Sequence, residues 1–512
     1  MNAHFVSGEK PGRQAQKLSA LSKYVQKYPQ GWKKRLELAN LLCQMGNWQQ
    51  AVAEYHQVIE RQPHLIEVRL QLGKILQVMG RPQEAIDIYE QALSLSENQG
   101  TQHHIHGSIA VCRHESQQAI VAFNLAARLE PTKVVHWLAL AQVHQQREDP
   151  LGAIGACEPI LSINPNDVVA LIYSYDALLA WGNIPAAKER LSQLIALAGD
   201  DLRVLQRQIE HRCQRRWISG KAGKLTKKLI TAALHQAPQG AEVRNLLAYY
   251  HILRGDWAQG VKVLAEFTAE HPKHPYGWYF YGQCLFETGN FQQAAKMMGK
   301  AYRLYAEDCA IHQALCDILP AAKQLEALRP VVEEMLQQFP DRWSVQAKAG
   351  RVWVEQFQAV ERGCRVSEQG TILQPHLAAA WLCHGRVLAL AGKHQQAVES
   401  LEKGRALLPT GGYLQLVPGL VWLGESYQVL GEAEASQRYW EAAGEGCREL
   451  QAFNPAVAAY WLGRALVGLG ERVEAIQVYD RALSQQLLYP ARGEVEKIMR
   501  RLKDRRRKGY RG

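Results

Sequence analysis

The sequence contains none of the common signatures of a catalytic site. Its 512 residues include no glycine-rich phosphate loop, no nucleophile elbow and no His-Glu-x-x-His motif. No apolar run reaches the roughly 18–20 residues that a membrane-spanning helix requires, and Met1–Lys17 lacks the hydrophobic core of a secretory signal. We therefore expect a non-enzymatic, cytoplasmic protein that uses no cofactor and no metal.

The sequence also has no Cys-x-x-Cys pair, although it contains ten cysteines. Many of these cysteines fall on apolar faces of expected helices, a distribution typical of reduced, buried thiols in the cytoplasm. A redox or zinc site would require distant cysteines to converge in space. We therefore predict that the cysteines are reduced, buried thiols and do not form a redox or zinc site.

What the chain does have is a 34-residue period. Five consecutive units begin at Trp32, Ile66, Gly100, Val134 and Val168. The twentieth position of every unit is alanine, at Ala51, Ala85, Ala119, Ala153 and Ala187. The eighth position holds Ala39, Gly73, Gly107, Ala141 and Tyr175, and the twenty-fourth holds Tyr55, Tyr89, Phe123, Cys157 and Leu191. A period of this length predicts an array of helical hairpins.

Each recurring position has a physical explanation. Small residues at the eighth and twentieth positions let two helices approach closely, and a ring at the twenty-fourth fills the space beside them. Gly46, Gly80 and Gly182 lie between the two apolar segments, where glycine can take the left-handed conformation that ends a helix. Proline at 63, 131 and 165 follows the second segment and stops it.

The pattern resembles the tetratricopeptide repeat family over most of residues 31–490. The resemblance is best in Ile66–Gln99, and it is also good in Ala378–Pro409 and Ala456–Leu483. It implies an all-α, right-handed superhelical solenoid of stacked helix-turn-helix repeats, with about thirteen helix pairs. Such repeats serve many unrelated partners, so the resemblance does not identify a function.

The array is not uniform. Pro320 and Pro330 fall inside one unit and are expected to shorten or bend its helices. We predict seven segments: an N-terminal cap (1–30), a five-repeat block (31–199), an atypical basic helix pair (200–240), a second block (241–342), a degenerate repeat (343–377), a third block (378–490) and a basic C-terminal capping helix and tail (491–512).

The resemblance implies that the first helix of each pair lines a concave groove. The groove positions mix apolar and polar residues, which suits an extended peptide or a helix. The candidate protein-binding residues are Asn40, Lys74, Tyr249, Tyr276, Tyr279, Gln283 and Phe286. The four aromatic residues form either an interface hot spot or packing between neighbouring helices. Leu36 stands where a carboxylate-binding clamp would require lysine, so we do not expect that clamp.

Two basic segments account for the net charge of +11. Arg203–Lys228 contains nine Lys and Arg residues against one acid, and Ala491–Gly512 contains ten against three. The candidate basic residues are Arg212, Arg215, Arg216, Lys224, Lys227, Lys228, Arg500, Arg501, Arg505, Arg506, Arg507 and Lys508. They are either a solvated helix end or a contact for an acidic protein, a membrane surface or nucleic acid.

One histidine motif, His103-His104-x-His106, is compatible with a metal cluster, but a polar helix start is the favoured interpretation. Two functional hypotheses result. The first is a non-enzymatic scaffold or assembly adaptor that binds partner segments in the groove. The second is a nucleic-acid or ribosome-associated adaptor that uses segments 203–228 and 491–512.

Overall fold

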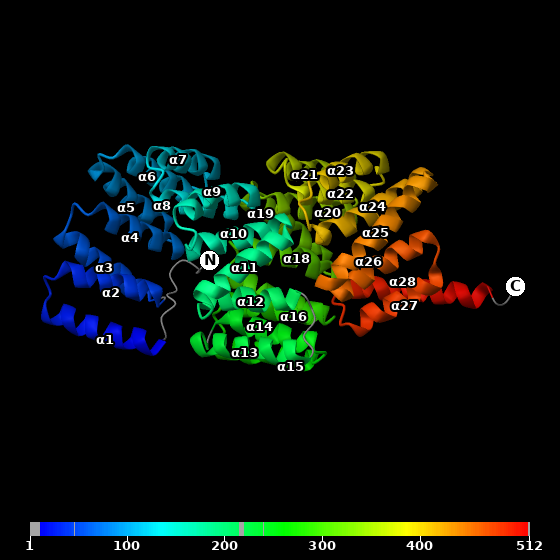
Figure 1. The fold of residues 1–512 in the computed structure, drawn as a ribbon, viewed down its shortest axis with the longest axis horizontal. Coiled ribbons are helices and arrows are strands. Elements are labelled where there is room, and N and C mark those ends of the chain that lie inside the picture. Colours follow the sequence, from blue (N-terminus) through cyan, green and yellow to red (C-terminus); the bar gives the residue numbers. More distant parts are fainter. Residues whose placement is uncertain (1–10, 46, 215–219, 239, 510–512) are drawn as a thin grey trace. The chain divides into compact units, whose positions relative to one another are not determined.

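The computed structural model describes residues 11–45, 47–214, 220–238 and 240–509. Over these ranges the chain forms 28 helices and no strand. Helices α2 to α27 make thirteen consecutive pairs, preceded by α1 and followed by α28 (Figure 1). The predicted all-α array of stacked helix pairs is therefore confirmed.

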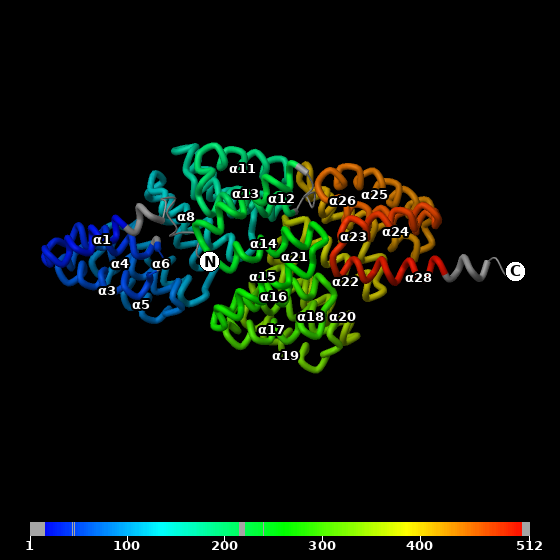
Figure 2. The backbone as a smooth tube through the Cα atoms, turned by 90° about the horizontal axis from the view of Figure 1, so that it is seen from below, coloured from blue at the N-terminus to red at the C-terminus, as the bar shows by residue number. Residues whose placement is uncertain are grey.

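The chain divides into two compact units. The first comprises Met1–Ala180 and Ala186–Leu205, and the second comprises Trp181–Pro185 and Gln206–Gly512. The predicted boundaries at 30, 199, 240, 342, 377 and 490 remain predictions. Consecutive helices pack against each other from α1 to α9 and from α13 to α28, and Figure 2 traces the backbone through these helices.

The first unit contains the five in-register pairs. Its helices are α1 (Pro11–Lys27), α2 (Trp32–Gln44), α3 (Trp48–Arg61), α4 (Ile66–Val78), α5 (Pro82–Leu95), α6 (Gln99–Cys112), α7 (Ser116–Leu129), α8 (Val134–Gln146), α9 (Pro150–Ile163), α10 (Val168–Trp181) and α11 (Ile184–Ala198). Helix α12 (Leu202–Gln214) begins in this unit and continues into the second.

The second unit contains the remaining pairs. Its helices are α13 (Gly220–Gln236), α14 (Ala241–Leu253), α15 (Trp257–Glu270), α16 (Pro275–Glu287), α17 (Phe291–Leu304), α18 (Cys309–Ala321), α19 (Leu325–Gln338), α20 (Trp343–Phe357), α21 (Val360–Leu373), α22 (Ala378–Leu390), α23 (His394–Ala406), α24 (Tyr413–Leu430), α25 (Ala433–Phe453), α26 (Pro455–Leu469), α27 (Arg472–Ser484) and α28 (Ala491–Gly509).

The turns between paired helices follow the glycine prediction. Gly80 and Gly182 have φ of 70° and 97°, in the left-handed region. Gly46 lies outside the described residues. Where glycine is missing from the turn, a side-chain-bearing residue takes the same conformation: His114 has φ of 60° and Lys323 has φ of 58°. The fold therefore imposes the left-handed turn even where the sequence disfavours it.

The close approach of paired helices is also confirmed. A Cβ added to Gly73 would lie 2.5 Å from the ring of Tyr89, and one added to Gly107 would lie 2.7 Å from the ring of Phe123. The five twentieth-position alanines are buried. The eighth and twenty-fourth positions thus meet inside these two pairs, and the ring occupies the volume that a larger residue at the eighth position would need.

The two prolines do not shorten their helices, and the alternative expectation, that they bend them, stays a prediction. Helix α18 contains Pro320 and still has 13 residues, and α19 contains Pro330 and has 14. Pro320 lies in the last turn, where the helix is about to end. Helix α19 continues through Pro330 because its apolar face, including Leu328 and Val332, is fully buried in the core.

Residues about 200 positions apart or more meet within the second unit. The segment that joins α27 to α28 contacts the turns of α14–α15 and α16–α17: the Trp257 indole donates a hydrogen bond to Gln486 at 3.0 Å, and the Tyr489 ring lies 5.1 Å from that of Phe291. Gln415, at the start of α24, lies beside Gly182 in the same way. These contacts join residues about six to seven repeat lengths apart in the sequence, so distant repeats of this unit pack against each other.

Candidate protein-binding surface

Four of the predicted residues lie on two adjacent first helices of the second unit. Tyr276, Tyr279 and Gln283 project from α16, and Tyr249 projects from α14. Helix α16 begins with proline at its first position, and the His274 side chain accepts a hydrogen bond from the Gly277 amide. One side of α16 is buried through Gly282, Cys284 and Leu285. We call the half-buried set Tyr249, Tyr276, Tyr279 and Gln283 the tyrosine face.

The tyrosine face is held in place by hydrogen bonds to neighbouring helices. The Tyr276 hydroxyl donates to the Asp308 carboxylate at 2.6 Å. Asp308 also caps α18, because it accepts from the amide of Ala310 at 2.8 Å and from that of Ile311 at 3.2 Å. The Tyr276 ring lies 6.2 Å from that of Tyr279 and 6.4 Å from that of Tyr305. Contacts within the chain therefore fix the orientation of the Tyr276 ring.

Tyr279 and Tyr249 are also held by hydrogen bonds to other side chains of the chain. Gln283 donates to the Tyr279 hydroxyl at 2.7 Å, and the Tyr249 hydroxyl donates to the Glu287 carboxylate. Burial and then the Asp308 charge raise the pKa of Tyr279 to about 12. Burial and the hydrogen bond to Asp308 raise the pKa of Tyr276 as well. These tyrosines consequently remain neutral phenols at physiological pH.

Phe286 lies at the end of the tyrosine face and packs against its own chain. Its ring is 5.7 Å from that of Phe291, and it contacts the core formed by α16 to α20. Of the predicted aromatic residues, Phe286 has the environment expected for packing between helices.

The two remaining candidates belong to the first unit. The Asn40 side-chain oxygen accepts a hydrogen bond from the Tyr55 hydroxyl at 2.5 Å, so the amide is engaged by its own repeat. Lys74 is half-buried, and burial lowers the pKa of its ammonium group. The predicted binding residues are thus divided between the two units.

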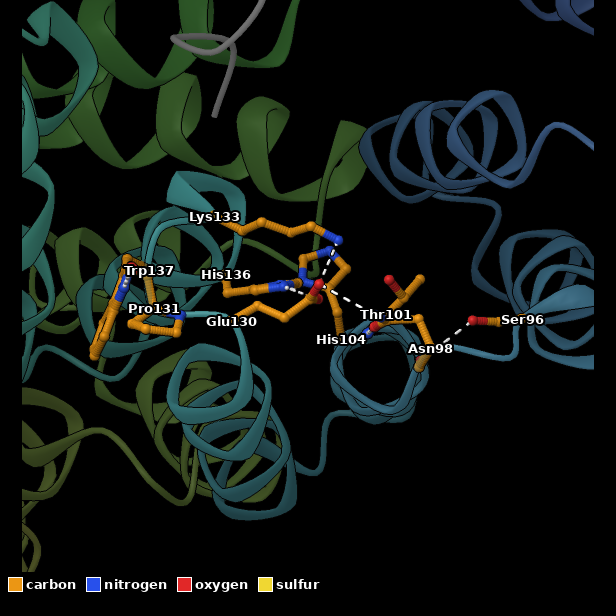
Figure 3. Close-up of polar contacts among 9 residues, drawn as sticks. All are labelled: Ser96, Asn98, Thr101, His104, Glu130, Pro131, Lys133, His136 and Trp137. Carbon is orange, nitrogen blue, oxygen red and sulfur yellow. Dashed lines mark hydrogen bonds and ion pairs between the residues drawn. The ribbon is translucent and has the colours of Figure 1, made fainter.

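The structure shows a buried histidine pair that the sequence motif did not predict. His104 and His136 lie on successive first helices with their Nδ1 atoms 3.1 Å apart. His136 Nε2 is 3.0 Å from the Glu130 carboxylate, which also accepts from Lys133 at 2.6 Å (Figure 3). If both rings are neutral, His136 donates through Nε2 and its Nδ1 accepts from His104. The signal for this pair was a histidine near the start of two adjacent repeats.

The charge state of this pair follows from its surroundings. Burial, followed by the nearby His136 and Lys74, lowers the pKa of His104 to about 3. Burial lowers the pKa of His136 too, although Glu130 opposes that shift. His103 and His106 do not join the pair; His106 is exposed. Within the described part of the chain, no group of three or more His, Cys, Asp or Glu residues could hold a metal ion.

Later helices of the second unit carry ion pairs between neighbouring repeats. Asp317 on α18 lies 2.6 Å from Lys348 and 2.7 Å from Arg351, both on α20. Burial alone would raise the pKa of Asp317, but the two cations lower it. Glu425 on α24 contacts Arg386 at 3.3 Å and also pairs with Arg464. The sequence alone did not indicate these pairs because each joins different repeats.

The basic segments are only partly described. Lys224, Lys227 and Lys228 are exposed on one face of α13, and Arg212 is half-buried on α12. Arg500 and Arg501 are exposed on α28. Arg215 and Arg216 lie outside the described residues, as do the side chains of Arg505, Arg506, Arg507 and Lys508.

The opposite face of α28 belongs to the core. Val495 is fully buried and Met499 is 5% exposed, and both pack against α26 and α27. Residues 491–502 therefore cover the last repeat, so only substitutions or a shorter truncation can separate the charge of this segment from its packing.

The ten cysteines are free thiols, and nine of them are buried. Burial raises the pKa of Cys316 to about 12 and that of Cys447 to about 12, so these thiols are protonated and unreactive. Separately, among the helices that the structure describes, none combines the length and the apolar content needed to cross a bilayer.

Three stretches of the chain match models of known families. Residues 34–98 and 456–481 each match a model described as tetratricopeptide repeat. Residues 226–301 match a model described as anaphase-promoting complex, cyclosome, subunit 3. No curated protein matches the chain. Together with the recurring helix pairs, the first two matches show that the chain contains tetratricopeptide repeats.

Several solved structures are similar to the chain at low identity. Yeast Tom70 is 14% identical, with 76% of this chain and 94% of that chain covered and a TM-score of 0.41. The Cut9–Hcn1 heterotetramer of the APC/C is 12% identical, with 89% and 94% covered and a TM-score of 0.38. YrrB is 18% identical, with 37% and 97% covered and a TM-score of 0.24.

Proposed function

We propose that this protein is a non-enzymatic scaffold that holds a segment of a partner protein against the tyrosine face. The observation that carries the proposal is the arrangement of Tyr249, Tyr276 and Tyr279, three half-buried rings on adjacent first helices. Tyrosine contributes a large contact area together with a polar tip, and it is enriched at interface hot spots.

The rigidity of this face supports the proposal. Each of the three tyrosine hydroxyls is already hydrogen-bonded to a neighbouring side chain. A partner would therefore meet rings whose rotamers are fixed, and binding would cost less side-chain entropy than it would with mobile rings.

Affinity capture with a double variant tests the proposal. Tyr279→Ala with Phe286→Ala should abolish capture of the partners that the unaltered chain retains. Gln293→Ala with Lys296→Ala, at exposed positions of α17, is the matched control and should capture them normally. Because Phe286 packs against Phe291, Tyr279→Ala alone is measured as well, with circular dichroism as the check on folding. Equal capture by all variants would overturn the proposal.

A second candidate function is binding to nucleic acid through the basic segments. The observation that favours it is the shared exposed face of Lys224, Lys227 and Lys228 on α13. Binding through phosphate contacts weakens steeply as salt is added. Changing the three lysines to glutamine should reduce both RNA affinity and its salt dependence; an unchanged salt dependence would exclude this surface.

A further inference from the structure

Two consecutive leucines between α27 and α28 belong to different hydrophobic cores. Leu487 is 1% exposed and packs with Val495 in the core of the last repeat. Leu488 is 4% exposed and packs instead with Ile252 of α14 and Cys284 of α16. One short segment of the chain therefore anchors two cores that are distant in the sequence.

The residues on either side of the second leucine contact the turns of the same early helices. Gln486 accepts a hydrogen bond from the Trp257 indole at 3.0 Å, and Arg492 Cζ lies 4.8 Å from the centre of that ring. The Tyr489 ring meets the Phe291 ring edge to face, with 5.1 Å between ring centres. The segment is thus held by an aliphatic side chain, an aromatic ring, an amide and a cation, as a bound peptide would be.

We call residues 486–492 the connecting segment and the surface that receives it the turn site. The turn site consists of side chains from the ends of α14 to α17: Ile252, Trp257, Val263, Cys284 and Phe291.

Two glycines let the connecting segment approach the backbone of the turn site. A Cβ added to Gly289 would lie 2.9 Å from the Tyr489 ring, and one added to Gly255 would lie 3.2 Å from the Gln486 side chain. At the corresponding turn glycine of an earlier repeat, Gly80, nothing lies within 4 Å of such a Cβ. These two turns are therefore closely covered by the connecting segment.

The connecting segment is held in a conformation that its sequence disfavours. Gln486 has φ of 59°, in the left-handed region that penalises a Cβ. Residues such as His114 and Lys323 share this conformation, but they follow the first helix of a pair, whereas Gln486 follows a second helix. Strained residues of this kind cluster at ligand clamps and switch regions. Release of the segment from the turn site would relieve the strain.

We propose that the turn site is a peptide-binding site that the connecting segment fills within its own chain, and from which a segment of a partner protein displaces it. The partner segment carries an aliphatic residue followed by tyrosine, with arginine three residues beyond. Its aliphatic side chain enters the core between α14, α15 and α16, its tyrosine packs on Phe291, and its arginine stacks on Trp257. This inference does not depend on the tyrosine face.

A segment that is joined to its site by the same chain competes at a high effective concentration. A partner peptide therefore binds the unaltered chain weakly, because only the open fraction of the molecules can accept it. Removing the side chains of Leu488 and Tyr489 empties the site and removes this competition. Leu487 is left in place, because it anchors the segment in the core of the last repeat.

The test measures peptide binding to the full chain by fluorescence anisotropy. The probe is a fluorescein-labelled synthetic peptide of residues 484–494 of this sequence, and a control peptide carries Leu488→Ala with Tyr489→Ala. The same two substitutions are made in the chain to empty its site. We expect the emptied chain to bind the probe at least about tenfold more tightly than the unaltered chain does, and to bind the control peptide no better.

A further substitution in the emptied chain locates the site. Trp257→Ala should reduce affinity for the probe about tenfold, because it removes the ring that contacts both ends of the segment. Trp137→Ala, at a half-buried tryptophan of the first unit, is the matched control and should leave the affinity unchanged. Circular dichroism checks folding, and Trp257→Phe, which keeps an aromatic ring in the core, repeats the measurement if Trp257→Ala does not fold.

Four outcomes would overturn the inference. Three are equal affinity of the emptied and unaltered chains, equal binding of the two peptides, and equal loss of affinity in the Trp257 and Trp137 variants. The fourth comes from sedimentation velocity. If the unaltered chain forms a dimer that Leu488→Ala with Tyr489→Ala dissociates, the connecting segment fills the turn site of a second copy and the assignment to a partner protein is wrong.

Discussion

Gly73 on α4 lies against the ring of Tyr89 on α5, so close that a Cβ at residue 73 would be 2.5 Å from ring carbons. This pair is the eighth and twenty-fourth position of one repeat, and Gly107 with Phe123 and Gly463 with Tyr479 repeat it. The contact explains why the 34-residue period holds a small residue in register with a large one.

Gly73→Ala should therefore destabilise the first unit, although alanine is the better helix former. Overpacking a core typically costs about 1–3 kcal/mol, while the gain in helix propensity is about 1 kcal/mol. The control is Gly155→Ala on α9, where no atom lies within 4 Å of the new Cβ. We expect the melting temperature to fall for Gly73→Ala and to rise for Gly155→Ala; a rise for both would contradict the packing argument.

The turns without glycine are places where the fold can be stabilised. His114 and Lys323 are exposed and hold φ of 60° and 58°. Replacing either with glycine should raise the free energy of unfolding by about 1 kcal/mol, because the left-handed conformation penalises a Cβ. Arg113→Gly, at a neighbouring residue with φ of −86°, should instead lower it. Chemical denaturation of the three variants measures the difference, and a loss of stability in His114→Gly would refute the assignment.

The buried histidine pair predicts acid sensitivity in the first unit. Burial lowers the pKa of His104 to about 3 in the folded state. Below about pH 6.5 this imidazole therefore binds a proton in the unfolded chain but stays neutral in the folded one. Stability from this residue is complete above that value. It falls by up to about 1.4 kcal/mol per pH unit as the pH drops from there toward 3.

Hydrogen exchange in α6 and α8 at pH 7.0 and 5.5 checks this prediction, with rates corrected for the intrinsic effect of pH. Protection should fall at the lower pH, and His104→Gln should reduce that fall. His106→Gln, at an exposed position of the same helix, should not. The same pH dependence in His104→Gln and in the unaltered chain would show that the pair does not carry the effect.

The parts of this fold that the sequence predicted are local. The left-handed turn at Gly80 and the contact between Gly73 and Tyr89 each fall within one repeat, so a fixed spacing reveals them. The same spacing placed Tyr249, Tyr276 and Tyr279 on adjacent first helices. What it could not supply was the hydrogen bond from Tyr276 to Asp308, which depends on the orientation of two side chains in neighbouring repeats.

The features missed by the sequence are nonlocal. Trp257 donates a hydrogen bond to Gln486, which is 229 positions away in the sequence, and a 34-residue period does not predict that contact. The pairs Asp317–Lys348 and Glu425–Arg464 likewise join different repeats. The expected shortening at Pro330 fails for another reason: helix α19 continues through this residue because burial of its apolar face outweighs the local penalty.

The central claim is that a partner segment lies on the tyrosine face, and cross-linking from one position tests it most directly. A photoreactive residue is introduced by Tyr279→p-benzoylphenylalanine in the full chain, and a second sample carries it at the exposed position Gln293 of α17. After irradiation in cells, mass spectrometry maps the adducts. We predict that partner peptides are attached at residue 279 and absent at residue 293; adducts at 293 alone, or the same peptides at both positions, would contradict the claim.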